Sequence, residues 1–176
     1  MSKNWTRRKR LEKRREQMIP QIKKILYATD LSKNSSYAFL YAVDTAKKYG
    51  AKIVILHAME PVPRYAEIRA GITDMMKRKQ QEETVEDLKK HLQGFCKKAE
   101  TQVGFPCVEL VSKILVPIGH PPEEILGAAE KEGCDIIVLG THGKGFLANT
   151  FLGSVSNAVL HLTRKPVFII PLPSEK

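Results

Sequence analysis

The sequence predicts one α/β domain built on a doubly wound, mostly parallel sheet of five strands, with helices on both faces. Three observations carry this prediction. Short apolar runs alternate along the chain with longer segments of helical periodicity, as βαβ units require. The runs at 25–29, 53–59 and 136–140 are almost continuously apolar, which is typical of strands buried on both faces. A length of 176 residues suits one such domain, and a hydrophobic content of 43% excludes wholesale disorder.

The first strand and helix follow directly from the residues at their ends. The apolar run 25–29 ends in Asp30, and the segment 32–49 then repeats apolar residues at helical spacing. Ser32 offers N-cap chemistry to this helix, because its hydroxyl can accept a hydrogen bond from a free backbone N–H of the first turn. Gly50 is a typical C-terminal stop.

The middle of the chain contains a second strand and a long helix. Prolines at 61 and 63 close the strand 53–59, and residues 60–76 fit either a loop or an irregular helix. Residues 77–100 predict a long charged helix with one apolar stripe. The stripe consists of Val85, Leu88, Leu92 and Phe95.

The last third of the chain completes the alternation. Residues 107–116 alternate apolar and polar side chains, which predicts a less buried strand. Two prolines and two glutamates open a helix at 121–131, since proline suits the first turn and acidic residues favour the N-terminal end of the helix dipole. The remaining elements are a strand at 136–140, a loop at 141–152, a helix at 154–162 and a strand at 167–170.

Positive charge is concentrated at the N-terminus. The chain has a formal net charge of +10, and residues 1–20 hold eight basic and two acidic side chains, a net +6. We therefore divide the chain into a basic extension, 1–20, and a mildly basic domain, 21–176. Three interpretations of the extension remain open: a solvated, mobile tail, an arm that binds nucleic acid or an anionic surface, or an upstream start of translation ahead of Met18, with residues 1–17 not authentic.

Several classes of protein are excluded by what the sequence lacks. No apolar run approaches the roughly 18 residues of a membrane span, and the charged N-terminus has no apolar stretch typical of a secretory signal. Three widely spaced cysteines form no C-x-x-C pair, which argues against a disulfide scaffold and a structural zinc site. Reduced thiols in a cytoplasmic protein are the expectation.

Two strand ends carry the chemistry of a binding site. The first strand ends in Thr29-Asp30, and the fourth runs through the glycines at 140, 143 and 145 to Gly153-Ser154, at a helix start. Glycines let the backbone approach an anion, and free N–H groups at a helix N-terminus attract phosphate. The hydroxyls of Ser154 and Ser156 add donors, and the Asp30 carboxylate suits ribose hydroxyls. If strands one and four are neighbours, these groups face each other across a crevice.

The glycine spacing resembles a known family. Gly140-x2-Gly143-x9-Gly153-Ser154 is similar to the G-2x-G-9x-G-[S/T] signature of the universal stress protein family, in its ATP-binding subgroup. Residues 24–32 and 165–170 resemble the first and last strands of that family, and the similarity covers about residues 22–171.

The resemblance implies a Rossmann-like domain with strand order 3-2-1-4-5, an ATP-binding role in stress response or regulation, and a homodimer paired through Val167–Ile170. It also implies a divalent ion, Mg or Mn, on the phosphates of ATP, with no direct side-chain ligand. Asp30 would bind ribose. The backbone at Ala28, Ala58 and Leu139 would line the adenine and ribose pocket, and Gly140, Gly143, Gly153, Ser154, Val155 and Ser156 would hold the phosphates. Many members of the family have proline where this chain has Ala28.

Alternatives stay open for the site and for the activity. Asp30 has a purely structural alternative as a cap of the helix that begins near Ser32, and the glycines have one as ordinary turn residues. The sequence shows no clear general base, so catalysis is at most weak ATP hydrolysis. The alternative functions are a slow ATPase and a protein that binds nucleic acid or an anionic surface through its basic arm.

Overall fold

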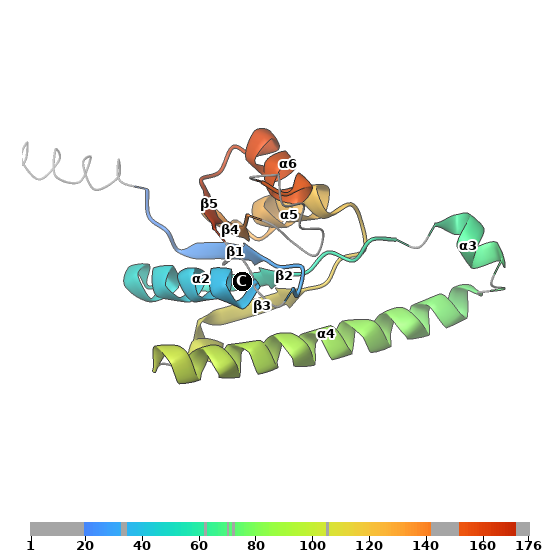
Figure 1. Cartoon of the computed structure of the whole chain (residues 1–176), viewed down its shortest axis with the longest axis horizontal. Helices are drawn as coiled ribbons and strands as arrows, with labels where there is room; N and C mark the ends of the chain where they lie inside the picture. Colours follow the sequence, from blue (N-terminus) through green and yellow to red (C-terminus); the bar gives the residue numbers. More distant parts are fainter. Residues whose placement is uncertain are drawn as a thin grey trace, which may run out of the picture.

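Five parallel strands form the centre of the molecule, in the order β3-β2-β1-β4-β5 (Figure 1). The computed structural model describes residues 20–171 apart from 33–34, 62, 70, 72, 105 and 142–151. Every strand pair within this sheet is parallel, so the predicted fold class and strand order are confirmed. The strands are β1 (Lys24–Ala28), β2 (Lys52–Leu56), β3 (Val111–Leu115), β4 (Ile136–Gly140) and β5 (Val167–Ile170).

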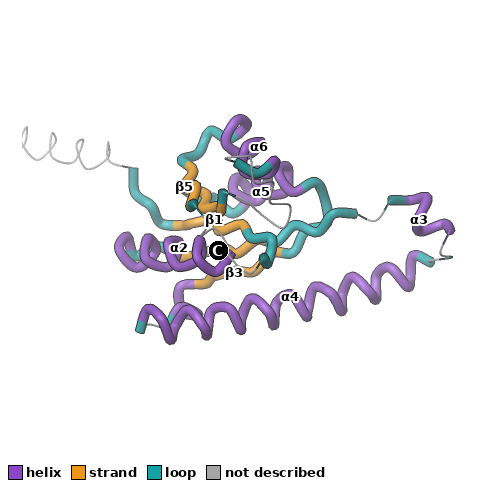
Figure 2. The backbone as a smooth tube through the Cα atoms, in the orientation of Figure 1, coloured by secondary structure: helices purple, strands orange, loops and turns teal. Residues whose placement is uncertain are grey.

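Helices cover both faces of the sheet. Helices α2 and α4 lie on one side, and α5 and α6 lie on the other (Figures 1 and 2). The alternating side chains of β1 explain this arrangement: Ile25 and Tyr27 belong to the core under α2 and α4, whereas Leu26 and Ala28 belong to the core under α5 and α6. The helical elements are α2 (Ser35–Tyr49), α3 (Arg64–Arg69), α4 (Asp74–Val103), η1 (Cys107–Leu110), α5 (Pro121–Lys131) and α6 (Ser154–Leu162).

The strand predicted at 107–116 is wrong in its first four residues. Cys107–Leu110 form the 3-10 helix η1, and β3 begins at Val111. Cys107 and Leu110 are both buried, and a separation of three residues places them on one side of a 3-10 turn. The second predicted strand, 53–59, is also too long: β2 ends at Leu56, and Met59 only forms an isolated bridge to Ile118.

The ambiguous segment 60–76 contains α3 and the beginning of α4. Helix α4 begins at Asp74, earlier than the sequence indicates, because the Thr73 hydroxyl accepts a hydrogen bond from the Met76 backbone N–H at 3.3 Å. It ends at Gly104, whose φ of 63° lies in the left-handed region that favours glycine. None of the helices in the described part of the chain is long and apolar enough to cross a membrane.

The amino end of β1 is fixed to the loop before β4. Asp135 Oδ2 accepts hydrogen bonds from the backbone N–H groups of Lys23, at 2.7 Å, and Lys24, at 2.9 Å. The Lys24 ammonium donates to the Glu132 carbonyl at 2.7 Å. These bonds fix the start of β1 against the segment before β4. The basic extension before residue 20 lies outside the described residues.

Candidate functional site

A cavity of about 560 Å³ opens at the carboxyl ends of β1, β2 and β4. Strand β1 pairs with β2 on one side and with β4 on the other, so the chain order reverses between β1 and β4. Open α/β sheets bind ligands at such a reversal, and the volume falls in the range of small-molecule sites. Figure 1 shows α6 and the exit of β1 on the two sides of this end of the sheet.

The turn after β1 forms the first wall of the cavity and holds Asp30 in place. The Thr29 backbone N–H donates to the Leu56 carbonyl at 2.9 Å, and Asp30 Oδ1 accepts the Ser32 N–H at 3.0 Å. Leu31, between Asp30 and Ser32, has a φ of 60°, a left-handed conformation that costs a non-glycine residue free energy. Such strained residues concentrate at ligand sites, where the surrounding structure holds them.

The second oxygen of Asp30 makes this wall chemically unusual. Oδ2 is buried, and it has no hydrogen-bond partner among the described residues. A buried acceptor without a donor carries a desolvation cost that a ligand hydroxyl would remove. The helix-capping alternative for Asp30 accounts for Oδ1, through Ser32, but leaves Oδ2 unexplained.

The second wall is the segment that follows β2. His57 Nδ1 lies 2.7 Å from the Thr29 carbonyl oxygen. Because a carbonyl can only accept, Nδ1 carries the hydrogen of this bond, and the ring links the ends of β1 and β2. Ala58, Met59 and Glu60 continue along the cavity, and the Met59 N–H donates to the Pro117 carbonyl at 2.8 Å. Hydrogen bonds therefore hold this wall both to the end of β1, through His57, and to the segment after β3, through Met59.

The third wall joins β4 to α6. The Gly153 N–H donates to the Thr141 carbonyl at 2.7 Å, and the Ser156 hydroxyl donates to the Gly140 carbonyl at 2.7 Å. These two bonds bring the ends of the segment 142–151 together. The first N–H groups of α6, from Ser154 onward, have no partner within the helix, and the helix dipole adds partial positive charge there. This wall can accept an anion.

Two details of the third wall differ from the sequence-based interpretation. The Ser156 hydroxyl, expected to donate to phosphate, gives its hydrogen to Gly140 instead, which leaves the Ser156 backbone N–H for a ligand. Gly153 has a φ of −67°, which any residue adopts, so its glycine is not required by backbone conformation. The absence of a side chain at 153 keeps the helix N-terminus open to the cavity.

Nine of the ten residues predicted for the site line this one cavity. They are Ala28, Asp30, Ala58, Leu139, Gly140, Gly153, Ser154, Val155 and Ser156. The tenth, Gly143, lies outside the described residues. The cavity also contains residues that the sequence did not indicate as site residues, among them Tyr27, Ser35 and His57. Tyr27 and His57 lie at the carboxyl ends of adjacent strands and Ser35 at the start of α2, and only these positions could have suggested them.

Tyr27 supports the floor of the cavity. Its hydroxyl donates to the Ser35 carbonyl at 2.7 Å, and burial raises the pKa of the phenol far above its usual range. The side chain therefore stays neutral and connects β1 to the first turn of α2. In the part of the chain that the structure describes, no group of three or more His, Cys, Asp or Glu side chains could hold a metal ion.

Comparisons with known proteins agree on one family. The model of the universal stress protein family matches residues 21–171. The universal stress protein MJ0577 of Methanocaldococcus jannaschii is 30% identical over 167 residues, covering 87% of this chain and 97% of that protein. A solved structure of MJ0577 superposes with a TM-score of 0.70 at 31% identity, covering 89% of this chain and all of the other.

Two more distant solved structures share the fold and contain a nucleotide. A universal stress protein in complex with cAMP has a TM-score of 0.55 at 21% identity, covering 86% of this chain and 98% of that chain. The universal stress protein from Archaeoglobus fulgidus in complex with dAMP has a TM-score of 0.50 at 18% identity, covering 88% of this chain and 100% of that chain. At these identities the likeness shows the fold alone.

Proposed function

The chain belongs to the universal stress protein family, and from that premise we propose that its cavity binds ATP in a regulatory role. The observation that carries the proposal is the pairing of two complementary groups across one cavity. Asp30 presents a buried acceptor oxygen without a partner, and the N-terminus of α6 presents backbone donors. A nucleoside phosphate can offer a ribose hydroxyl to Asp30 and phosphate oxygens to the N-terminus of α6.

The proposed roles follow the walls of the cavity. Asp30 Oδ2 accepts a hydrogen bond from a ribose hydroxyl, and the phosphates lie toward α6. The adenine and ribose lie against the backbone of Ala28, Ala58 and Leu139. The phosphate-binding set is Gly140, Gly143, Gly153, Ser154, Val155 and Ser156, with Ser156 acting through its N–H. The nucleotides in the complexes with cAMP and dAMP support adenine as the base, as a property of fold neighbours.

A divalent ion, Mg or Mn, accompanies ATP in this proposal and neutralises charge on the phosphates. The described residues offer no side-chain cluster for it, so its ligands would be phosphate oxygens and water. Hydrolysis is at most slow. A turnover of ATP that exceeds that of a Gly143→Asp, Gly153→Asp double variant would favour the slow ATPase instead.

Binding is tested with freshly purified full-length protein. Mass spectrometry of the small molecules released on denaturation is expected to detect ATP, and equilibrium dialysis is expected to give a dissociation constant in the micromolar range or below. Gly153→Val, which places a side chain over the α6 N-terminus, is expected to abolish binding while the far-ultraviolet circular dichroism spectrum stays unchanged. No binding of ATP with either Mg²⁺ or Mn²⁺ present would contradict the proposal.

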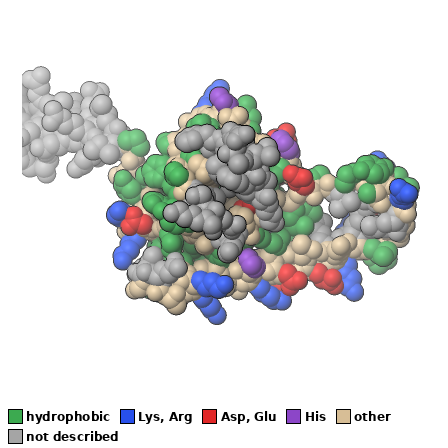
Figure 3. Space-filling model, in the orientation of Figure 1, with side chains coloured by type: hydrophobic (Ala, Val, Ile, Leu, Met, Phe, Trp, Pro, Cys, Tyr) green, Lys and Arg blue, Asp and Glu red, His purple; other side chains and the backbone are tan. Residues whose placement is uncertain are grey.

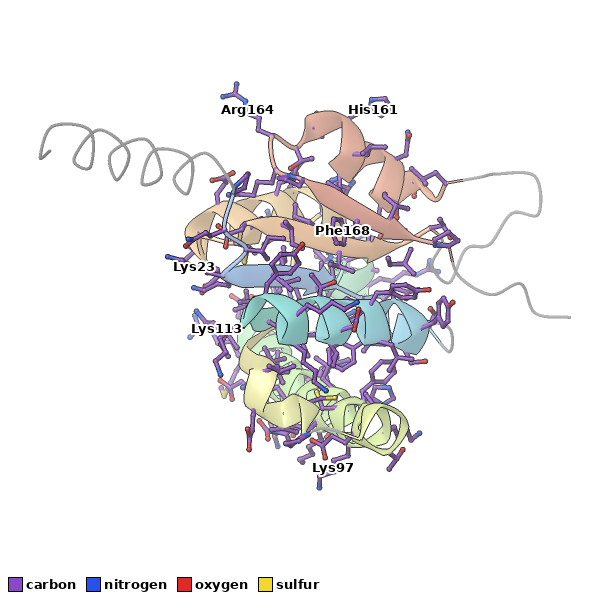
Figure 4. The ribbon with its side chains drawn as sticks, turned by 90° about the vertical axis from the view of Figure 1, so that its left-hand side faces the viewer. Lys23, Lys97, Lys113, His161, Arg164 and Phe168 are labelled. Carbon is purple, nitrogen blue, oxygen red and sulfur yellow. The ribbon has the colours of Figure 1, made fainter. Side chains whose placement is uncertain are left out.

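The homodimer is proposed to form through β5. This strand lies at the edge of the sheet and pairs with β4 on one side. Phe168, labelled on β5 in Figure 4, is 38% exposed. Among the described strands, none pairs with the other side of β5. An apolar edge strand of this kind invites pairing with another strand, and a second copy supplies one.

Two further sequence-based expectations remain predictions. Cytoplasmic location is one. The other is the nucleic-acid arm, which rests on the net charge of +6 in residues 1–20. Deletion of residues 1–17 is expected to flatten the salt dependence of nucleic-acid binding, because fewer counterions are then released. Unchanged affinity for nucleic acid after the deletion would exclude nucleic-acid binding through residues 1–20.

A further inference from the structure

Helix α3 and the first half of α4 form an arm that projects from the domain (Figures 1 and 2). Helix α4 has 30 residues and is about 45 Å long. It reaches the core only with its second half, where Leu92, Cys96 and Ala99 are buried. Every described side chain from Asp74 to Glu83 is exposed. We call residues 64–87 the arm.

The end of the arm exposes large apolar side chains. Tyr65 is 75% exposed, Ile68 72%, Met75 81% and Met76 58%. Figure 3 shows hydrophobic atoms next to basic groups at this projecting end. Single exposed apolar residues are ordinary, but four large ones within residues 65–76 indicate a binding surface.

The same end is positively charged. Residues 64–79, which form that end, contain five Lys and Arg and two Asp and Glu, a net +3, whereas the following residues 80–87 contain four acidic side chains and no basic one. The side chains of Arg64, Arg69, Arg78 and Lys79 are exposed. The occupant of this surface must therefore accept apolar side chains and carry negative charge.

We propose that the end of the arm docks on an anionic phospholipid surface. Apolar side chains with flanking cations insert at the boundary between headgroups and acyl chains, and each nearby cation is attracted by anionic lipid. Tyr65 suits that boundary because its ring is apolar and its hydroxyl polar. The unbranched side chains of Met75 and Met76 adapt to a fluid partner.

The charge and shape of the arm argue against other occupants. Two arm ends placed against each other would repel, because residues 64–79 of each copy carry a net +3. Nucleic acid would use the cations but not the exposed methionines. The apolar groups stand on a projecting end, and a lipid layer can deform around such an end without a preformed groove.

Binding to vesicles tests the proposal with the full-length protein. Vesicles of phosphatidylcholine with one quarter phosphatidylglycerol are sedimented and compared with vesicles of phosphatidylcholine alone. The apolar variant is Tyr65→Ser with Ile68→Ser, and its control on the body is Leu160→Ser with Leu162→Ser, two other exposed apolar residues.

The charge variant and its control lie on one helix. The variant is Arg78→Gln with Lys79→Gln, and the control is Lys97→Gln with Lys98→Gln near the other end of α4. Lys97, labelled in Figure 4, points away from the body. All four residues are exposed, so substitution leaves the core intact.

The native chain is expected to prefer the anionic vesicles, and each arm variant is expected to lose about tenfold or more in partition coefficient. The controls are expected to stay within about twofold of the native chain. The basic extension is present in every protein, so differences between variants and controls report the arm alone. Arm variants that bind like their controls would overturn the proposal. Arm variants that dissociate an oligomer in sedimentation velocity would also overturn it, by showing that a second copy covers the arm.

Discussion

Removal of the Asp30 carboxylate separates binding from stability. In Asp30→Ala, the hydrogen bond from the Ser32 N–H is lost, at a cost of about 1 kcal/mol. The buried oxygen without a partner is lost as well, which removes a penalty of about 1–3 kcal/mol. The two effects roughly cancel in the ligand-free protein, so we expect a Tm that is unchanged or a few degrees higher, since 1 kcal/mol shifts Tm by about 2–4 °C at this chain length.

Binding of ATP should respond much more strongly. A hydrogen bond to a charged acceptor contributes about 1.5–3 kcal/mol, so Asp30→Ala is expected to weaken ATP binding by about 10- to 150-fold. Asp30→Asn keeps an oxygen for the Ser32 N–H, and its ATP affinity is expected to fall between those of the native chain and Asp30→Ala. Isothermal titration calorimetry gives the affinities, and thermal unfolding without nucleotide gives Tm.

Asp135 provides a matched control at the amino ends of β1 and β4, the end of these strands opposite the cavity. Its Oδ2 accepts two backbone N–H groups, so Asp135→Ala is expected to lower Tm by several degrees and to leave ATP affinity unchanged. The reasoning fails if Asp30→Ala lowers Tm as much as Asp135→Ala does while binding ATP within about twofold of the native chain. The Asp30 carboxylate would then serve only the turn.

Three further predictions address the third wall, the edge strand and the buried thiols. Ser156→Ala removes the bond to the Gly140 carbonyl and is expected to lower Tm by about 2–4 °C in differential scanning calorimetry; an unchanged Tm would show that the bond contributes nothing. Phe168→Glu places a charge on each side of the proposed β5 pairing and is expected to give monomers in analytical ultracentrifugation, whereas a persistent dimer would place the interface elsewhere. Burial raises the pKa of Cys96 and Cys134 to about 11, from 9.0, so both thiols should react with a disulfide reagent only after unfolding. Equal reaction rates in native and urea-unfolded protein at pH 8 would contradict this protection of the thiols. Because the folded-state pKa is higher than the unfolded one, the contribution of the two thiols to stability is present below pH 9.0 and is lost toward pH 11.

The buried part of the fold could be predicted from sequence because burial leaves a pattern. The strand at 136–140 begins and ends as expected, since every residue of β4 before Gly140 is buried. The strand at 167–170 also has the expected bounds, although only Ile170 of β5 is buried. The sequence of the arm, residues 64–87, has no such pattern of buried apolar residues. Met75 and Met76 resemble core or loop residues in sequence, yet they are exposed on a helix, and only the Thr73 cap fixes where that helix begins.

From the residues alone, the site was predictable only where a strand end or a helix start carries its own chemistry, and the family resemblance added backbone positions such as Ala58 and Leu139. Asp30 lies just after β1, Gly140 ends β4 and Gly153 precedes α6, so the sequence indicated them. The hydrogen bond from Ser156 to Gly140 spans 16 residues, and the contact of His57 with Thr29 spans 28. The first contact depends on how α6 packs back on the end of β4, and the second depends on the pairing of β1 with β2. Local periodicity contains no information about either.

The cavity and the arm share one segment of chain, and its attachment decides how they influence each other. Residues 56–60 line the cavity, and α3 begins at Arg64. Met59 is the cavity residue that holds this segment in place, because both of its backbone groups form hydrogen bonds. Its N–H donates to the Pro117 carbonyl at 2.8 Å, and its carbonyl accepts the Gly119 N–H at 2.9 Å. A ligand that moves Ala58 must break this bridge before the arm responds. The arm is therefore held at two places, by the Met59 bridge and by the second half of α4, which packs in the core.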